Sequence, residues 1–182
     1  HDFEITIFGD ETHVNYNRIL LSSVLAGEKE VDDIILNDID WYRGNDIQAR
    51  LGLRIDKIDL TNKTIHSAQG CTTAFDRLLI ATGSSPFLPP IDGIDKQGVF
   101  VFRTLDDAKH LLALSGAGVK AVVIGGGLLG LEAARGLQLQ GCDVTVLHLG
   151  THLMDRQLDF TRGQFLKRKL ESLGIAVICK AS

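Results

Sequence analysis

The sequence predicts an α/β fold with parallel strands, and three observations support it. A β-rich apolar run, residues 119–124, leads directly into Gly-Gly-Gly-Leu-Leu-Gly at residues 125–130. A helical pattern follows, and a second β-rich run, residues 143–147, returns after Gly141 to complete a strand–helix–strand unit. Near the beginning, the alternating strand at residues 3–8 ends in Gly-Asp, as the second strand of such a unit does. We therefore expect two Rossmann-like dinucleotide-binding units, both incomplete in this chain.

Glycines fill the G-x-G-x-x-G pattern between the first strand and the helix of the later unit. Gly125 permits the tight turn, Gly127 lets the backbone approach a pyrophosphate, and Gly130 lets the helix pack closely. The N-terminus of the helix then offers unpaired amides and the positive end of its dipole. A purely structural glycine turn is the alternative. The residues predicted to surround the pyrophosphate are Gly125, Gly126, Gly127, Leu128, Leu129 and Gly130.

Composition excludes several classes of partner. The 182 residues are 45% hydrophobic, which is enough for a real core, and the formal net charge is −4. This charge gives no electrostatic reason to bind nucleic acid or an anionic membrane. Neither a membrane-spanning apolar run nor a signal-peptide pattern is present, which indicates a cytoplasmic protein. The three cysteines have no disulfide or metal-ligand spacing.

The elements before the glycine turn follow from local patterns. A short helix ending at Gly44 has Asp38 as its N-cap. After Gly70, residues 75–83 begin with charged residues and are expected to form a buried strand that ends in a Thr-Gly turn. The segment that begins at Ser84 contains several prolines and is expected to be a linker. Thr104 is placed to cap a helix. The further strands are expected at residues 47–51, 53–60, 64–67, 99–102 and 175–179, the further helices at residues 105–115 and 160–173, and a loop at residues 149–159.

Two polar residues near the beginning have open interpretations. Asp10 follows the strand at residues 3–8, where an acidic side chain can accept hydrogen bonds from a ribose. A solvated turn explains it equally well. Arg18 could hold a phosphate or form a surface ion pair, and the residues alone do not favour either.

Residues 75–86, Phe-Asp-Arg-Leu-Leu-Ile-Ala-Thr-Gly-Ser-Ser-Pro, resemble the second flavin motif of flavoproteins with two dinucleotide-binding domains. These are the pyridine nucleotide-disulfide oxidoreductase superfamily, in which the G-x-G-x-x-G belongs to an NAD(P)H domain inserted within the FAD domain. The resemblance covers nearly the whole chain. It implies that residues 1–104 are part of an FAD-binding domain and residues 105–182 the first part of an NAD(P)H-binding domain.

Three further blocks, around residues 9–22, 37–42 and 148–159, look like the large subunit of assimilatory NAD(P)H-dependent nitrite reductase. That family places the flavoprotein module ahead of iron–sulfur and sirohaem regions that reduce nitrite to ammonium. The resemblance implies FAD and NAD(P)H as cofactors, with those downstream regions or a small subunit as electron acceptors. A ferredoxin or rubredoxin reductase, and a nucleotide-binding module without turnover, remain as alternatives.

The resemblance also implies roles for single residues. Asp10 would contact the FAD adenosine ribose, Arg18 the phosphate side of the flavin nucleotide, and the Ile55 backbone the adenine. Thr82 and Gly83 would lie at the FAD pyrophosphate, and Arg103 beside the flavin. Glu132 would approach the nicotinamide amide, with a partner of the helix dipole as the alternative. No acid or base is assigned, because the cofactors carry the chemistry.

Three departures from the superfamily pattern modify these expectations. The chain starts at His1, without Met and without the first glycine loop of the FAD domain, so we expect a fragment that binds FAD weakly or not at all. The edge left without that first strand makes a homodimer plausible. Ser22 and Ser23 replace the redox cysteines of thiol-reducing relatives, so electrons should leave the flavin for an external centre. His148 stands where NAD-preferring enzymes place a ribose-binding carboxylate, which leaves NADPH open.

Overall fold

The computed structural model describes residues 3–181, while His1, Asp2 and Ser182 lie outside the described residues. Backbone contacts divide the described chain into two units. The first unit comprises residues 3–17 and 35–85, and the second unit comprises residues 18–34 and 86–181. Each unit is described by itself below. Within the described residues, no helix has both the length and the apolar content needed to cross a bilayer.

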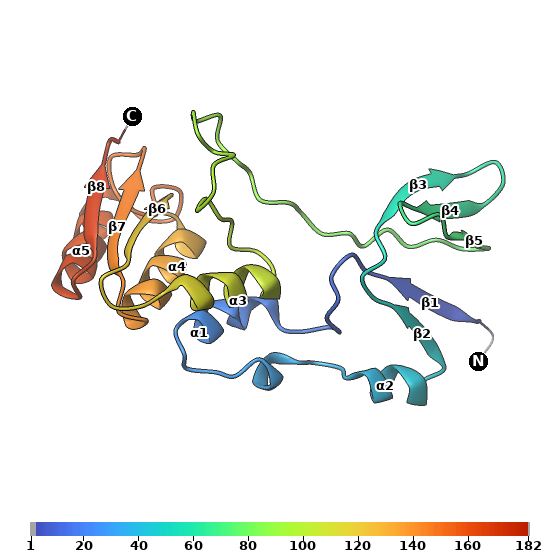
Figure 1. Ribbon diagram of the computed structural model, residues 1–182. Helices are drawn as coiled ribbons and strands as arrows, with labels where there is room; N and C mark the ends of the chain where they lie inside the picture. Colours follow the sequence, from blue (N-terminus) through green and yellow to red (C-terminus); the bar gives the residue numbers. More distant parts are fainter. Residues whose placement is uncertain (1–2, 182) are drawn as a thin grey trace. The chain divides into compact units, whose positions relative to one another are not determined.

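The first unit contains two small sheets (Figure 1). Strand β1 (Ile5–Phe8) pairs in parallel with β2 (Ile47–Arg50), and β3 (Ile55–Asp59), β4 (Thr64–Ser67) and β5 (Thr72–Ala74) form an antiparallel sheet. The sequence predicted the first four of these strands but not β5.

Helix α2 (Ile39–Gly44) precedes β2 and begins where its cap was predicted. The Asp38 side chain accepts a 2.7 Å hydrogen bond from the Trp41 amide. The Trp41 ring meets that of Tyr42 edge-on, with the ring centroids 5.3 Å apart. The N-cap prediction is therefore confirmed, and it came from a purely local signal.

The second unit contains the predicted strand–helix–strand arrangement. Strand β6 (Lys120–Ile124) is followed by α4 (Leu128–Leu139), β7 (Asp143–His148), α5 (Phe160–Ser172) and β8 (Ala176–Cys179). The three strands are parallel, in the order β6-β7-β8, and the register pairs Ile124 with Leu147. Two parallel strands joined by a helix confirm the α/β prediction.

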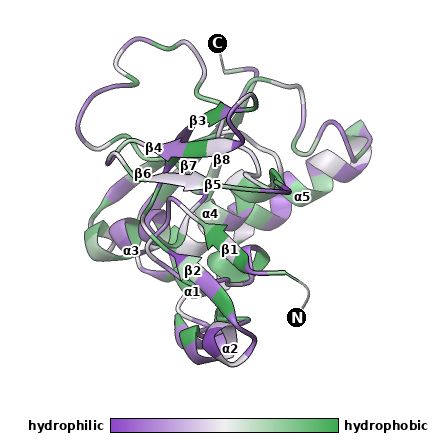
Figure 2. Ribbon diagram, turned by 90° about the vertical axis from the view of Figure 1, so that its right-hand side faces the viewer, coloured by the Kyte–Doolittle hydropathy of each residue, from purple (hydrophilic) through white to green (hydrophobic). Residues whose placement is uncertain are grey.

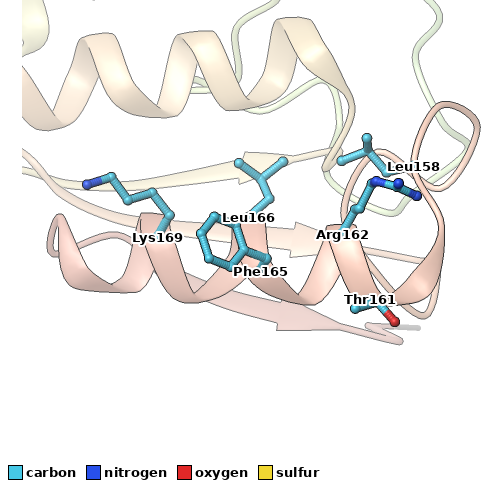
Figure 3. A pocket seen from close by; sticks show the side chains of 6 residues that line it. All are labelled: Leu158, Thr161, Arg162, Phe165, Leu166 and Lys169. Carbon is cyan, nitrogen blue, oxygen red and sulfur yellow. The ribbon is translucent and has the colours of Figure 1, made fainter.

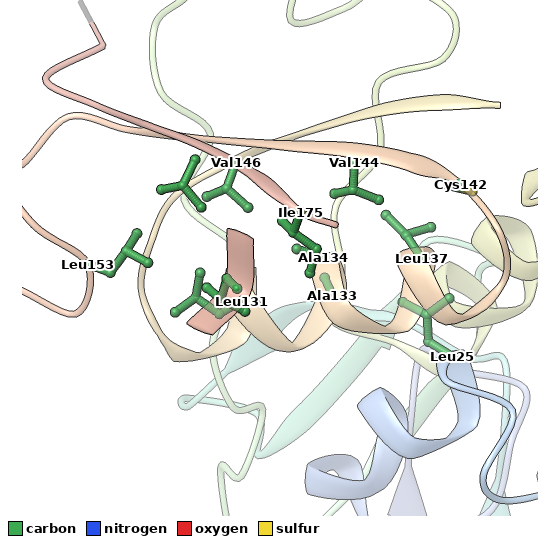
Figure 4. Close-up of a cluster of buried hydrophobic side chains, with 12 residues drawn as sticks. Leu25, Leu131, Ala133, Ala134, Leu137, Cys142, Val144, Val146, Leu153 and Ile175 are labelled. Carbon is green, nitrogen blue, oxygen red and sulfur yellow. The ribbon is translucent and has the colours of Figure 1, made fainter. Parts of the chain in front are cut away.

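A short segment from early in the chain belongs to this unit. It contains the 3₁₀ helices at Arg18–Leu20 and Asp32–Ile34 and the five-residue helix α1 (Leu21–Leu25). Leu25 is fully buried in the same core as Leu137 and Val144 (Figure 4). A β carbon on Gly136 would lie 2.8 Å from Leu25 Cγ, so α1 and α4 are in close contact.

Helices α3 (Leu105–Leu114) and α5 begin at side-chain caps. Thr104 Oγ1 accepts from the Asp107 amide and Asp107 accepts in return from the Thr104 amide, which makes a capping box. Asp159 caps α5, and the hydrogen bond from the Arg162 amide lowers the pKa of the Asp159 carboxyl. Hydrophobic and hydrophilic residues alternate in bands along α5 (Figure 2).

Two predicted strands are wrong. Residues 75–83 and 99–102 have no regular secondary structure. Leu79, expected in a buried strand, is 86% exposed. A strand needs a partner for its backbone hydrogen bonds, and among residues 3–181 no named strand pairs with either segment. Gly83 has a positive φ of +70°, but residues 82 and 83 form no turn.

Candidate functional site

The glycine turn between β6 and α4 is the centre of the candidate site. Gly125, with φ +123°, adopts a backbone conformation that other residues rarely take, and its amide donates to the Leu147 carbonyl at 2.8 Å. Gly127 is the N-cap of α4, with an extended backbone and no capping side chain. The turn, residues 125–127, therefore connects the end of β6 to the start of α4 with three residues.

Gly127 and Gly130 differ in what surrounds them. A β carbon on Gly130 would lie 2.1 Å from the carbonyl oxygen of Gly125, a distance that no side chain can occupy. A β carbon on Gly127 would meet nothing within 4 Å. Gly130 is thus required for packing of the helix against the turn, whereas the space beside Gly127 is open to a ligand.

The first turn of α4 supplies hydrogen-bond donors. The amides of Leu128, Leu129 and Gly130 belong to the first helical turn, where an α-helix has no intrahelical acceptors. Both leucine side chains are exposed, so the approach to this end is not covered by a buried apolar layer. Unpaired amides and the positive end of a twelve-residue helix dipole suit a phosphate group.

Gly126 is held on both sides of its backbone. Its amide donates to Nδ1 of His148 at 3.1 Å, and its carbonyl accepts from the Met154 amide at 2.8 Å. Met154 has φ +51°, which is unusual for a residue other than glycine. The segment 149–159 was predicted only as a loop, and its sequence gives no signal that it contacts the glycine turn.

His148 is directed toward the protein interior at the end of β7. Its side chain is only 12% exposed, and Nε2 is buried without a hydrogen-bond partner among the described residues. Oδ2 of Asp155 lies 3.7 Å from Nε2. The imidazole lies beneath the glycine turn, in contact with Gly126.

Glu132 lines a groove beside the same helix. The groove has a volume of about 290 Å³, and its lining includes Ser22 and Ser23 from α1, Glu132 and Arg135 from α4, and Met154. Glu132 lies in the second turn of α4 and is half-buried. The Glu132 carboxylate therefore lines a groove that also includes Leu128, the first residue of α4.

Arg18 and Arg103 are brought together within the second unit. Nη1 of Arg18 donates to the Arg103 carbonyl at 2.7 Å, and the Arg103 amide donates to Asp107 Oδ2 at 2.9 Å. Both arginines are half-buried. Arg18 and Arg103 are far apart in the sequence, but they lie next to each other just before the start of α3.

The other predicted flavin-site residues lie in the first unit. Asp10 is exposed at the end of β1, and its Oδ2 lies 3.6 Å from Nη1 of Arg54. Ile55, next to Arg54, begins β3 and is half-buried. Thr82 and Gly83 are exposed in the irregular segment 75–83. The structure thus brings Asp10 near Ile55 through Arg54, but it does not assemble all four.

A separate groove lies on α5, with a volume of about 460 Å³. Figure 3 shows the side chains that line it, which are Leu158, Thr161, Arg162, Phe165, Leu166 and Lys169. Leu166 lines both this groove and the one beside Glu132. None of the residues of the glycine turn contributes to the groove on α5.

Comparison with known proteins gives concordant results. The family model described as "Pyridine nucleotide-disulphide oxidoreductase" matches residues 1–182. The chain is 51% identical over 177 residues to "Nitrite reductase [NAD(P)H]" of Bacillus subtilis, covering 97% of this chain and 22% of that protein. It is 48% identical over 178 residues to the "Assimilatory nitrate reductase electron transfer subunit" of the same organism, covering 98% of this chain and 23% of that protein.

Among solved structures, NADH:rubredoxin oxidoreductase from Clostridium acetobutylicum matches with a TM-score of 0.85 and 30% identity, covering 98% of this chain and 47% of that one. The resemblance to nitrite reductase large subunits is confirmed by the curated relatives, which include "Nitrite reductase (NADH) large subunit" of Escherichia coli, 38% identical over 176 residues and covering 97% of this chain and 21% of that protein. The chain spans about a fifth of the length of these curated relatives.

Proposed function

Because the chain belongs to the pyridine nucleotide-disulphide oxidoreductase family, we propose that it is the flavoprotein module of a nitrite reductase. In this proposal, electrons pass from NAD(P)H through FAD toward iron–sulfur and sirohaem centres that reduce nitrite to ammonium. Those centres would lie in other regions of the complete protein or in a partner subunit. The chain would work in the cytoplasm, with residues 1–104 serving FAD and residues 105–182 serving NAD(P)H.

One observation carries the nucleotide part of the proposal: the backbone of Gly127 is open at the start of α4, while Gly130 is closed against Gly125. A glycine turn built only for packing would need Gly130, whereas the open space at Gly127 also lies at the N-terminus of a twelve-residue helix, where the backbone amides have no intrahelical acceptors. The amides of Leu128 and Leu129 lie beside that space and suit the pyrophosphate of NAD(P)H. The residues present therefore fit this cofactor.

The fit to FAD is partial. Arg18 and Arg103 form one hydrogen-bonded pair, and Asp10 offers an exposed carboxylate at a strand end, as a ribose contact requires. Thr82 and Gly83 lie in a segment without a strand. We propose these residues as FAD contacts on the strength of the family.

When bound, the two cofactors supply the hydride transfer and the separation of the electron pair into single electrons. The contribution of this chain is to bind and orient. The amides at the start of α4 fix the pyrophosphate, and Glu132 is placed to accept a hydrogen bond from the nicotinamide amide in the adjoining groove. No side chain of the groove is needed as a general acid or base.

Replacing Glu132 by glutamine tests the orienting role. We expect reduction of the flavin by NADH or NADPH to slow by about tenfold, because the neutral amide oxygen of glutamine accepts a weaker hydrogen bond than a carboxylate oxygen and orients the nicotinamide less precisely, while the dissociation constant changes by less than about threefold. The measurement is anaerobic rapid mixing of the complete flavoprotein with each nucleotide, following the loss of flavin absorbance.

Glu171→Gln is the control, because Glu171 lies on α5 and lines neither groove. It should leave the rate of flavin reduction unchanged. Equal rates in wild type and Glu132→Gln would remove Glu132 from the nicotinamide site. Absence of flavin reduction in the wild-type protein would refute the proposed function itself.

A ferredoxin or rubredoxin reductase is the second candidate, favoured by the similarity to a solved NADH:rubredoxin oxidoreductase. The two candidates share the NAD(P)H and FAD elements and differ in the final acceptor. Reduced complete protein should produce ammonium from nitrite if the first proposal holds. Reduction of added rubredoxin or ferredoxin at a comparable rate, without ammonium formation, would favour the second.

A further inference from the structure

We infer that His148 is a positioning residue that orients the glycine turn through Gly126 and does not itself contact the nucleotide ribose. The inference rests on the proposed function in one respect, namely that the glycine turn binds the pyrophosphate of NAD(P)H. It differs from the role that the position of His148 in the sequence suggested, which was recognition of the ribose 2′ position.

The hydrogen bond to Gly126 determines which tautomer His148 adopts. Nδ1 accepts the Gly126 amide proton, so it carries no proton, and the neutral ring holds its proton on Nε2. Nε2 is buried and points toward the Asp155 carboxylate, 3.7 Å from Oδ2. Nδ1 is therefore occupied by the Gly126 amide, and Nε2 is buried away from solvent, so neither nitrogen is accessible to a ribose hydroxyl while this arrangement lasts.

Close packing keeps the imidazole in place. A β carbon on Gly126 would lie 2.8 Å from Cγ of His148 and 2.6 Å from Cδ2 of Leu153. A β carbon on Gly150 would lie 2.7 Å from Nε2 of His148 and 2.4 Å from Oδ2 of Asp155. Glycine at both positions is thus what allows the ring to lie under the turn.

The contact to Gly126 affects the amides that follow it. Met154 fixes the carbonyl of Gly126 and His148 fixes its amide, so the orientation of this peptide segment is determined from both ends. Gly127 and Leu128 come next, and their amides lie where an anion would bind. Loss of the His148 contact would allow the turn to rotate, and the donors would no longer point to one place before the ligand arrives.

Two substitutions of His148 by an amide side chain test whether a hydrogen-bond acceptor is needed at the place of Nδ1, because both are polar and only one puts its oxygen there. The side-chain oxygen of asparagine can occupy the place of Nδ1, whereas that of glutamine reaches about as far as Nε2. In the complete protein, we expect His148→Asn to bind NADH and NADPH within about threefold of wild type. We expect His148→Gln to bind both about tenfold more weakly, with the ratio of the two affinities unchanged, as the loss of one hydrogen bond implies.

A second measurement does not depend on the cofactor. Hydrogen exchange of the Gly126 amide should remain slow in wild type and His148→Asn and become about tenfold faster in His148→Gln. Asp155→Asn serves as the matched control, because it changes the carboxylate that lies 3.7 Å from Nε2 without touching the Gly126 contact. Its Gly126 exchange should equal that of wild type.

The inference is overturned if the two variants behave alike in both measurements. It is also overturned if either variant changes the ratio of NADH to NADPH affinity by tenfold or more, since that would place His148 at the ribose. Failure of the wild-type protein to bind either nucleotide, with Gly126 exchange following the expected order, would instead refute the proposed function and leave the positioning role intact.

Discussion

Replacing Gly130 by alanine is expected to destabilise the second unit by about 3 kcal/mol, near the upper end of the cost of overpacked sites. The added methyl would lie 2.1 Å from the Gly125 carbonyl oxygen and 3.1 Å from the Gly125 carbonyl carbon. Both are backbone atoms, so relief requires α4 to move away from β6. Urea denaturation followed by circular dichroism measures the effect.

Gly136→Ala is the matched control for this substitution. Its methyl would also meet a close neighbour, but that neighbour is Cγ of the Leu25 side chain, at 2.8 Å, and not a backbone atom. We expect its cost to be clearly smaller than that of Gly130→Ala. If the urea midpoints of Gly130→Ala and wild type coincide, the close packing of helix and turn is not required for stability.

Gly127→Ala should act on binding and not on stability, in contrast to Gly130→Ala. We expect the protein to fold normally and to lose nucleotide affinity. The Gly127 backbone has φ −85° and ψ 176°, which alanine adopts without strain, and the new methyl would meet no protein atom within 4 Å. The change at the helix N-cap should cost less than about 1 kcal/mol of stability.

The same methyl would occupy the space that a pyrophosphate needs beside the Gly127 backbone. We expect the affinity for both NADH and NADPH to fall at least tenfold, which corresponds to about 1.4 kcal/mol. Calorimetric titration of the complete protein with each nucleotide is the measurement. Gly44→Ala is the control, because Gly44 is equally open and ends a helix in the first unit. Unchanged affinity in Gly127→Ala would mean that the open space is not the binding site.

The local patterns of the sequence predicted the strand–helix–strand part of the second unit, β6 to β7, well. The apolar run ending at Ile124, the glycines and the return strand at Asp143 each specify their conformation from neighbouring residues, and the parallel register of β6 and β7 follows from their connection by a helix. Caps at Asp38 and Thr104 were predictable for the same reason, since an N-cap bonds to an amide three residues away.

Features that depend on distant partners were not predictable in this way. Residues 75–83 have the composition of a buried strand, yet composition does not supply the neighbouring strand that a ladder requires. Helix α1 has five residues and no capping side chain, so its place against α4 depends on the burial of Leu25 and not on local propensity.

The orientation of the His148 ring could not be predicted from the sequence for a similar reason. Its position at the end of β7 was evident, but the direction of the ring depends on how the segment 149–159 folds. Met154 in its left-handed conformation and Gly150 beside Asp155 together create the space in which the ring lies. Placement of the residue could be predicted, whereas its hydrogen-bond partner could not.

The location of the single tryptophan has a practical consequence. Trp41 belongs to α2 in the first unit, and the glycine turn belongs to the second. Intrinsic fluorescence therefore follows melting of the unit that carries Asp10 and Thr82, whereas a nucleotide bound at Gly127 raises the melting temperature of the other unit by mass action. Fluorescence and circular dichroism recorded on one sample with added NADH would then show whether the two units melt together or separately.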